Sequence, residues 1–331
     1  MSKSHPIVEC IAQVSVGRDS ENLRGLAAAL SSIPDCYLLR QDTHPDTQQA
    51  VLTLAGQPDA VFAGAYQLYA YAALHPDPQQ DQADDSRIDA VTVCQFVPIS
   101  GVKEKDLMAQ AQVLAQRVAQ DFHLPVFLDV QSAASPDQKV LADIRRGAYQ
   151  GLAEKLRGSV AQPDYGPALP HPQLGATVIA VHPFHIAWNI NLAPGASPEQ
   201  AHTLAAKLSG NGPEGTPGLF PGLMATGERT APNDRWQISC DLINPDKTDL
   251  ARVYLTAVNL ATGLGTRVTG SELLGLIPEK YLRKAGKSFS FDGDREGEIE
   301  AAVTILGLGD LAPFNWRERV LEEVLRSASA D

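Results

Sequence analysis

The middle of the chain carries a segment that regular secondary structure cannot cross. Residues 161–172 read A-Q-P-D-Y-G-P-A-L-P-H-P, with five prolines or glycines among twelve residues. Proline lacks a backbone donor and glycine is flexible, so this composition marks a break between two structural units. A chain of 331 residues is long enough for a core on each side of such a break. We therefore predict two domains, residues 1–178 and 179–331.

Strand and helix patterns occur on both sides of the break. In the first half, alternation and β-branched residues predict strands at 7–16, 36–40, 51–55, 90–97 and 126–130. Apolar spacings of three and four predict helices at 20–33, 58–74, 103–122 and 140–156, with a loop at 42–49. In the second half, the same signals predict strands at 176–181, 185–192, 236–243 and 267–278. They also predict helices at 198–208, 248–264, 279–285 and 316–328.

Several of these strands follow one another directly, without a helix between them. That order favours layered sheets over a doubly wound parallel sheet. We predict the α+β class, with two layered α/β subdomains, each a mixed or antiparallel sheet with helices on one face. No G-x-G-x-x-G follows a strand and there is no P-loop, so neither nucleotide-binding fingerprint is present.

Composition argues against several classes of partner. The net charge of −12 disfavours nucleic-acid binding, which needs clustered Lys and Arg. No run of about eighteen apolar residues offers a transmembrane helix, and the first residues lack a signal-peptide layout, so we expect a cytoplasmic protein. The four cysteines include no C-x-x-C pair, and three lie in or beside apolar strand patterns. We expect free, buried thiols rather than a metal site or a disulfide.

One loop and the strand after it have the composition of a reaction site. Residues 84–102 read D-D-S-R-I-D-A-V-T-V-C-Q-F-V-P-I-S-G-V. The segment begins with carboxylates and Arg87, then alternates apolar and polar residues until Pro98 and Gly101 close the strand. Charged loop residues at the end of a strand are a common location for solvent-facing chemistry.

Motifs along most of the chain match those of one family, in the same order. They are I-V-E-C (7–10), S-V-G-R (15–18), V-C-Q-F-V-P-I-S-G-V (93–102), A-D-I-R-R-G-A-Y-Q-G-L-A-E-K-L (142–156), P-D-Y-G-P (163–167), G-A-T-V (175–178), A-W-N-I-N-L (187–192), R-V-T-G-S-E-L-L-G-L-I-P (267–278) and L-G-L-G-D-L-A-P-F (306–314). Together they resemble the formiminotransferase (glutamate formimidoyltransferase) family, whose members move a formimino group from 5-formimidoyltetrahydrofolate to glutamate.

The resemblance implies a fold, a ligand and an assembly. It implies two α/β subdomains, a homodimer, and a tetrahydrofolate derivative held as co-substrate in the crevice between the subdomains. It also implies a small amino acid as acceptor, and no metal.

The same resemblance shows where this chain departs from the family pattern. The family carries a histidine in an H-P-R-x-G-A loop, thought to be the catalytic acid/base, and ungapped counting back from Val93 places Asp85 there. Arg87 is retained, and Asp42 keeps the carboxylate of a second loop, so the implied catalytic positions are Asp85, Asp42 and Arg87. An aspartate is a weaker base and a poorer proton donor than histidine near neutral pH. The alternative is therefore a catalytically inactive homologue that binds folate or a partner protein.

The remaining candidates concern ligand binding. Gln13 and Ser15 stand in the segment Q-V-S-V-G-R, where the family has N-F-S-E-G-R, and we expect them to contact folate. Gly175 and Thr177 have small side chains, so a planar ligand could approach the backbone there. The alternative is that they only lead the chain from the break into the next strand.

Two further groups of candidates lie in the second half. Asn189 and Asn191 alternate with apolar residues and share one strand face, which either contacts ligand or is only solvated. Gly270, Ser271 and Glu272 offer backbone N–H groups and a carboxylate, or they form a strand-to-turn junction that needs glycine.

Histidines elsewhere offer a substitute for the missing imidazole. His44 and His75 are candidates for a relocated acid/base, and both also fit ordinary exposed loop residues. The spacing of His182 and His185 places them on opposite faces of a strand, which disfavours a shared metal.

Overall fold

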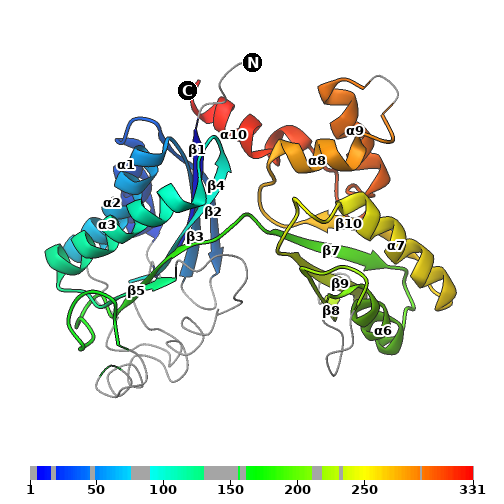
Figure 1. The fold of residues 1–331 in the computed structure, drawn as a ribbon, viewed down its shortest axis with the longest axis horizontal. Helices are drawn as coiled ribbons and strands as arrows, with labels where there is room; N and C mark the ends of the chain where they lie inside the picture. Colours follow the sequence, from blue (N-terminus) through cyan, green and yellow to red (C-terminus); the bar gives the residue numbers. More distant parts are fainter. Residues whose placement is uncertain are drawn as a thin grey trace. The chain divides into compact units, whose positions relative to one another are not determined.

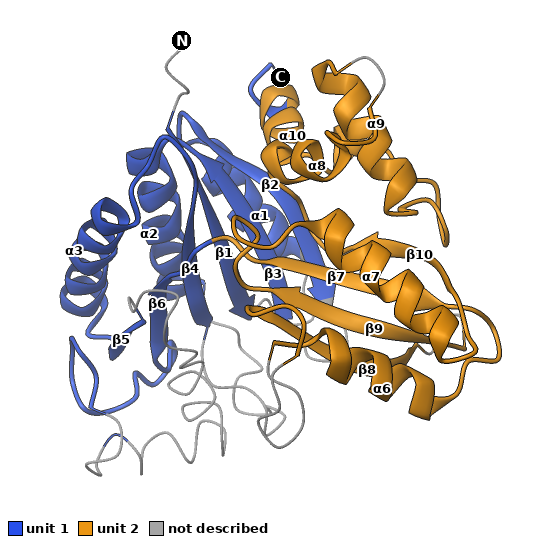
Figure 2. Cartoon of the chain, turned by 45° about the vertical axis from the view of Figure 1, so that its right-hand side comes forward, with its two compact units in different colours: residues 1–183, 328–331 blue, residues 184–327 orange. Residues whose placement is uncertain are grey.

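The computed structural model describes residues 6–15, 20–44, 49–75, 90–129, 156, 162–210, 218–230, 234–290 and 293–330. The chain forms two compact units, residues 1–183 with 328–331, and residues 184–327 (Figure 2). The break in composition at 161–172 precedes the last strand of the first unit, β6 (Thr177–Val181), and the predicted boundary at 178 lies inside that strand.

The first unit is a mixed sheet with helices on one face (Figure 1). Besides β6, its strands are β1 (Ile7–Ser15), β2 (Cys36–His44), β3 (Gln49–Gly56), β4 (Val91–Ser100) and β5 (Val126–Asp129). Its described helices are α1 (Ser20–Ser31), α2 (Pro58–Leu74) and α3 (Glu104–Phe122). The strand order is β2-β3-β1-β4-β6-β5, with β6 parallel to both of its neighbours and the other pairs antiparallel.

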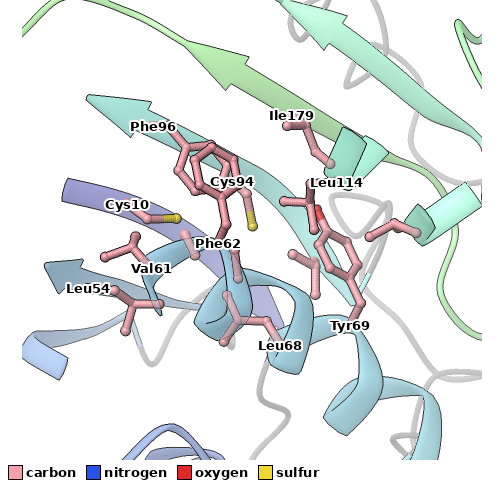
Figure 3. Close-up of a cluster of buried hydrophobic side chains, with 14 of the residues drawn as sticks. Cys10, Leu54, Val61, Phe62, Leu68, Tyr69, Cys94, Phe96, Leu114 and Ile179 are labelled. Carbon is pink, nitrogen blue, oxygen red and sulfur yellow. The ribbon is translucent and has the colours of Figure 1, made fainter. Parts of the chain in front are cut away.

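Alternation along the strands decides which face of this sheet is buried under the helices. Cys10, Ala12 and Val14 of β1 are each at most 3% exposed and belong to the core that α1–α3 complete. In that core, the rings of Phe62 and Phe96 stack with their centroids 4.0 Å apart (Figure 3). The intervening β1 residues project from the opposite face, which defines the first polar face considered below.

The second unit is an antiparallel sheet whose helices also lie on one face. Its strands are β7 (Ile186–Leu192), β8 (Leu223–Thr230), β9 (Arg235–Leu242) and β10 (Val268–Leu273), in the order β10-β7-β9-β8. Its helices are α6 (Pro198–Leu208), α7 (Leu250–Gly263), α8 (Glu279–Gly286), α9 (Arg295–Ile305), a 3₁₀ turn η3 (Trp316–Glu318) and α10 (Leu321–Ala328). Trp188, Ile190 and Leu192 are fully buried against these helices. The predicted α+β class, with one helical face for each sheet, is confirmed.

Several predicted elements were wrong in extent. The first residues of the predicted loop at 42–49 belong to β2, because Asp42 and Thr43 pair with the buried strand β3. β4 continues past Pro98 to Ser100, since a register shift between Ile7 and Val8 accommodates the proline. The single predicted C-terminal helix is a 3₁₀ turn and a separate helix.

Two elements escaped the sequence reading altogether. β8 has few apolar residues and contains Gly227, because it is an edge strand with only β9 as neighbour. α9 opens with R-E-G-E, and its N-cap is Asp294, whose carboxylate accepts from the Gly297 N–H at 2.7 Å.

Other expectations have varied outcomes. All four cysteines are free and buried, as predicted. No helix among the described residues is long and apolar enough to cross a membrane. The predicted helix at 140–156 lies outside the described residues apart from Leu156. Residues 211–217 of the Gly/Pro-rich run also lie outside them.

Candidate functional site

One row of paired residues crosses the first polar face, opposite α1–α3. Asp42 of β2 pairs with Val51 of β3, Val51 with Gln13 of β1, and Gln13 with Val93 of β4. Directly opposed residues in a sheet project from the same face. The structure therefore brings the predicted residues Gln13 and Asp42 to one face, separated by Val51.

Polar side chains on this row are already held by neighbours. The Arg40 Nε donates to Asp42 Oδ2 at 2.6 Å, and the side chains are 31% and 40% exposed. Gln13 donates through Nε2 to the Gln49 side-chain oxygen. Asp42 is thus one half of an accessible ion pair, which fixes its orientation but adds little stability.

The predicted catalytic residues Asp85 and Arg87 lie outside the described residues, as does the side chain of His44. Their segment rejoins the described chain at Ala90, whose carbonyl accepts from the Ser15 N–H at 2.9 Å. Ser15 continues the β1 alternation of Gln13, and its hydroxyl is buried without a hydrogen-bond partner among the described residues. His75 bonds through Nδ1 to the carbonyl of Tyr71 in its own helix, at 3.0 Å.

A second polar cluster lies on the same face, where β4, β6 and β5 meet. Gln95 pairs with Ala180, and Ala180 pairs with Asp129, so these three residues form one row. His182 directly follows β6, and its Nε2 lies 3.0 Å from Asp129 Oδ2. The Nε2 of Gln95 is buried without a partner in the described chain.

The expectation that His182 and His185 share a strand was wrong. Residues 182–185 connect β6 to β7 and belong to neither strand, because their backbones leave the first sheet here. The His182 N–H still donates to the Phe96 carbonyl, at 3.1 Å, which continues the β6 ladder by one residue. His185 belongs to the second unit, and its Nε2 is 3.9 Å from Asp241 Oδ1.

Two predicted binding residues of the first unit do not join these clusters. Thr177 is 1% exposed, and its hydroxyl is 2.9 Å from the Tyr69 hydroxyl of α2, so it points into the core. Gly175 has φ +70° and exchanges two 2.8 Å backbone hydrogen bonds with His171, forming a tight turn. That left-handed backbone explains the glycine without a ligand.

The second sheet has its own polar face, opposite its helices, and three amides lie on its central strands β7 and β9. Asn191 pairs with Gln237, and Asn189 pairs with Ser239, so the two predicted asparagines share this face as expected. Asn189, Asn191 and Gln237 are only 8%, 2% and 6% exposed. The Asn189 Oδ1 is buried without a hydrogen-bond partner among the described residues. A buried amide oxygen left unpaired is costly, so it is a natural acceptor for an incoming donor.

Asp310 organises the end of this second polar face. Its Oδ2 accepts from the Thr269 hydroxyl at 2.6 Å and from the Asn191 Nδ2 at 3.4 Å, and it lies 3.9 Å from Arg235. Gly270 allows this approach, because a Cβ there would lie 2.3 Å from the Asp310 Cβ. The predicted glycine therefore admits a neighbouring carboxylate rather than a ligand at that point.

The two residues after Gly270 face in opposite directions. Ser271 pairs with the core residue Ile190, is 1% exposed, and donates its hydroxyl to the Leu306 carbonyl at 2.6 Å. Glu272 pairs with Asn189 and is exposed on the polar face. Both residues border a recess of about 280 Å³ that Arg319, Glu318 and the 308–315 loop also line.

Buried carboxyls and thiols have shifted proton affinities. Burial raises the pKa of the Asp241 carboxyl, and the nearby His185 opposes that shift. Burial raises the pKa of the Cys36 thiol to about 11 and that of Cys240 to about 12. Such thiols are protonated and inert at neutral pH. No group of three or more potential metal ligands occurs in the part of the chain that the structure describes.

Sequence reasoning missed Gln95, Gln237 and Asp310, and gave Asp129 no role. One signal was present: in R-W-Q-I-S-C-D-L, every second residue of β9 is polar, which indicates a polar strand face. Gln95 and Asp129 share a row only through the parallel pairing of β6 with two strands, which no local pattern shows.

Two family models together match nearly the whole described fold. "Formiminotransferase domain, N-terminal subdomain" matches residues 7–182, and "Formiminotransferase domain" matches residues 187–326. The junction between the two matches coincides with the connection between β6 and β7.

Curated proteins with these names are similar over long stretches. Formimidoyltransferase-cyclodeaminase of Rattus norvegicus is 35% identical over 323 residues, covering 96% of this chain and 59% of that protein. Glutamate formimidoyltransferase of Streptococcus pyogenes serotype M1 is 32% identical over 276 residues, covering 83% and 90%. The Thermoplasma acidophilum protein of the same name is 27% identical over 296 residues, covering 88% and 95%. The chain thus spans about six tenths of the formimidoyltransferase-cyclodeaminase but most of the glutamate formimidoyltransferases.

Among solved structures, a peptidase M16 inactive domain from Pseudomonas fluorescens aligns with 98% of this chain and 87% of its own. The identity is 11% and the TM-score is 0.25, which is too low to support an argument. The two family matches, by contrast, extend from β1 to α10 with one short gap at the junction. This chain belongs to the formiminotransferase family.

Proposed function

We propose that the chain transfers a formimidoyl group between a tetrahydrofolate and the amino group of glutamate or another small amine. The observation that carries the proposal is the family match over both units, each of which presents one polar sheet face. The match with this chain extends over 90% and 95% of the two relatives named glutamate formimidoyltransferase. The tetrahydrofolate derivative is a co-substrate here.

The donors and acceptors of the polar faces suit such a ligand. A pterin ring is flat, uncharged and rich in hydrogen-bonding groups. The amides of Asn189, Asn191 and Gln237 offer donors and acceptors without net charge, and the unpaired Asn189 Oδ1 would accept from a ring N–H. Of the predicted binding residues, Gln13, Ser15, Asn189, Asn191 and Glu272 remain in this proposal, while Thr177, Ser271, Gly175 and Gly270 have structural roles.

The test is turnover in both directions. The purified chain with 5-formimidoyltetrahydrofolate and glutamate should form formiminoglutamate and tetrahydrofolate, and the reverse mixture should regenerate the starting pair. Product formation is followed by separating the folates. Absence of turnover with glutamate and with a panel of other amino acids would contradict the proposal.

A non-catalytic homologue that binds folate is the second candidate, because Asp85 stands where the resembled family has a histidine. It predicts that folates raise the melting temperature without any product. Asp85→His combined with Gln13→Asn should then create transferase activity if the rest of the site is intact.

We also propose that the chain is a homodimer, as the family resemblance implies, and that it acts in the cytoplasm. Light scattering coupled to gel filtration measures the assembly, and a mass of 35.4 kDa, that of a single chain, would contradict it.

A further inference from the structure

The polar face of the first unit contains a histidine that is held by a carboxylate. His182 Nε2 and Asp129 Oδ2 are 3.0 Å apart, and their side chains are 29% and 15% exposed. A carboxylate can only accept a hydrogen bond, so Nε2 carries the proton and donates it. In the neutral imidazole, Nδ1 is then the basic nitrogen, and it has no hydrogen-bond partner among the described residues.

The other histidines with described side chains have different environments. His75 bonds to a backbone carbonyl, His171 accepts from the N–H groups of Gln173 and Leu174, His202 packs beside Trp236, His185 is 3.9 Å from a carboxylate, and His123 ends α3 with φ 51°. Among the histidines with described side chains, His182 alone is held by a carboxylate at hydrogen-bond distance. A carboxylate in this position selects one tautomer and fixes the ring, as in proton-transfer sites of other enzymes.

The pair stands beside a small, buried side chain, that of Ala180, which is 3% exposed. Ala180 stands between Gln95 and Asp129 in one row, so its methyl group is the smallest side chain of the three. The buried Gln95 Nε2 has no partner and lies on the same face. The unpaired Gln95 donor lies opposite Ala180, and the His182 imidazole follows Ala180 by two residues. The three groups are therefore neighbours on one face of the sheet.

We propose that His182 is the proton-transfer group of the reaction and that Asp129 positions it, an inference that rests on the proposed transferase function. The glutamate nitrogen forms a bond to the formimidoyl carbon and gives a proton to His182 Nδ1. The bond from that carbon to folate N5 then breaks, and N5 takes the proton back from the imidazolium. Atoms and charge balance without an oxidant, a reductant or a metal. Gln95 donates to the ligand beside the reacting carbon.

This assignment places the chemistry at a definite position on the sheet. His182, directly after β6, is four residues beyond Val178, which pairs with Val93 in the row of Gln13 and Asp42. At about 3.3 Å per residue, that separation is roughly 13 Å along the strand. The row of Gln13 and Asp42 then binds a part of the ligand remote from the reacting carbon.

The experiment compares His182→Gln with the control His202→Gln, which alters an exposed histidine of α6. Glutamine keeps a donor for Asp129 but cannot exchange a proton at neutral pH. We expect His182→Gln to lower kcat about a hundredfold or more, with KM for the folate changed less than about threefold. The control should keep the wild-type kcat. Because glutamine keeps the hydrogen bond to Asp129 and His202 is exposed, the melting temperatures of both variants should match the wild type.

Two further variants separate proton transfer from structural support. His182→Ala should regain part of its kcat when free imidazole is added, an effect that a structural role would not produce. Asp129→Asn should lower kcat less than His182→Gln and leave KM unchanged. Asp42→Asn should raise KM for the folate and leave kcat largely intact.

The outcomes distinguish this inference from the function on which it rests. An active wild type whose His182→Gln variant keeps its kcat overturns the role of His182 and leaves the transferase function standing. The role of His182 is also overturned if free imidazole restores no activity to His182→Ala and Asp42→Asn abolishes kcat. A wild type without turnover in either direction overturns both.

Discussion

The two sheets share one plan and differ in the chemistry of their polar faces. Each sheet buries one face beneath helices and keeps polar side chains on the other. The first face carries the ion pair of Arg40 with Asp42 and the hydrogen-bonded pair of His182 with Asp129. The second carries buried neutral amides, and its Asp310 is satisfied by several donors at once. In the function proposed above, the first face would transfer protons and the second would bind an uncharged ring.

Burial explains why the division follows the units. A charge taken out of water needs a partner or loses its ionisation, whereas an amide needs only hydrogen bonds. The central strands β7 and β9 bury their part of the second polar face, with Asn191 only 2% exposed, so amides suit this position, whereas Glu272 of the edge strand β10 is exposed. The side chains of the two pairs on the first face remain 15% to 40% exposed, so water still reaches them. The following variants test this comparison.

The largest expected effect concerns the independence of the two cores. Phe96→Ala empties the first core beside Phe62, and Trp188→Ala empties the second; both residues are 0% exposed. Each change should lower the free energy of unfolding by about 3 to 5 kcal/mol. Calorimetry should show each variant lowering a different transition. Val113→Ala, at a side chain that is 65% exposed, is the control and should change stability by less than about 0.5 kcal/mol. Identical thermograms for the two core variants would contradict separate cores.

The next effect concerns the close approach of Asp310 to β10. In Gly270→Ala, the new Cβ would meet the Asp310 Cβ at 2.3 Å and the Gly307 carbonyl oxygen at 2.5 Å, so the loop must shift. We expect a loss of about 1 to 3 kcal/mol in stability and weaker folate binding, because Asn191 loses its acceptor. Gly309→Ala is the matched control in the same loop, since a Cβ there meets nothing within 4 Å. Titration calorimetry with folate should separate the variants, and equal affinities would argue against a binding role for the second face.

The smallest effect is a pH dependence at Asp241. Burial raises the pKa of this carboxyl above its ordinary 3.8, so its stabilising contribution is complete below pH 3.8 and is lost as the pH rises through the folded-state pKa. In Asp241→Asn the side chain cannot ionise, so this loss of stability at higher pH does not occur. The variant should melt roughly 1 to 3 °C above the wild type at pH 7, and the difference should vanish near pH 3. A lower melting temperature at pH 7 would show that the ion pair with His185 outweighs burial.

Much of the fold followed from local patterns in the sequence. The apolar spacing of Leu107, Ala111, Leu114 and Val118 defined α3, and the alternation around Asn189 and Asn191 placed both asparagines on one face of β7. These predictions succeeded because helical and strand periods are properties of neighbouring residues. Helix α9 and the edge strand β8 were not predicted, because each is stabilised by tertiary contacts that its own residues scarcely indicate.

By itself, the sequence determined the α+β class, the helical face of each sheet, the buried thiols and the resemblance to one family. Only the tertiary structure decided which polar residues meet. Thr177 and Ser271 turned inward because strand register assigned them to the core faces, and a shift of one residue would have reversed them. Asp129 and His182 are more than fifty residues apart, and they meet because β5 and β6 lie parallel at the sheet edge. Strand order is set by burial across the whole unit, so contacts of that kind are absent from any local stretch of sequence.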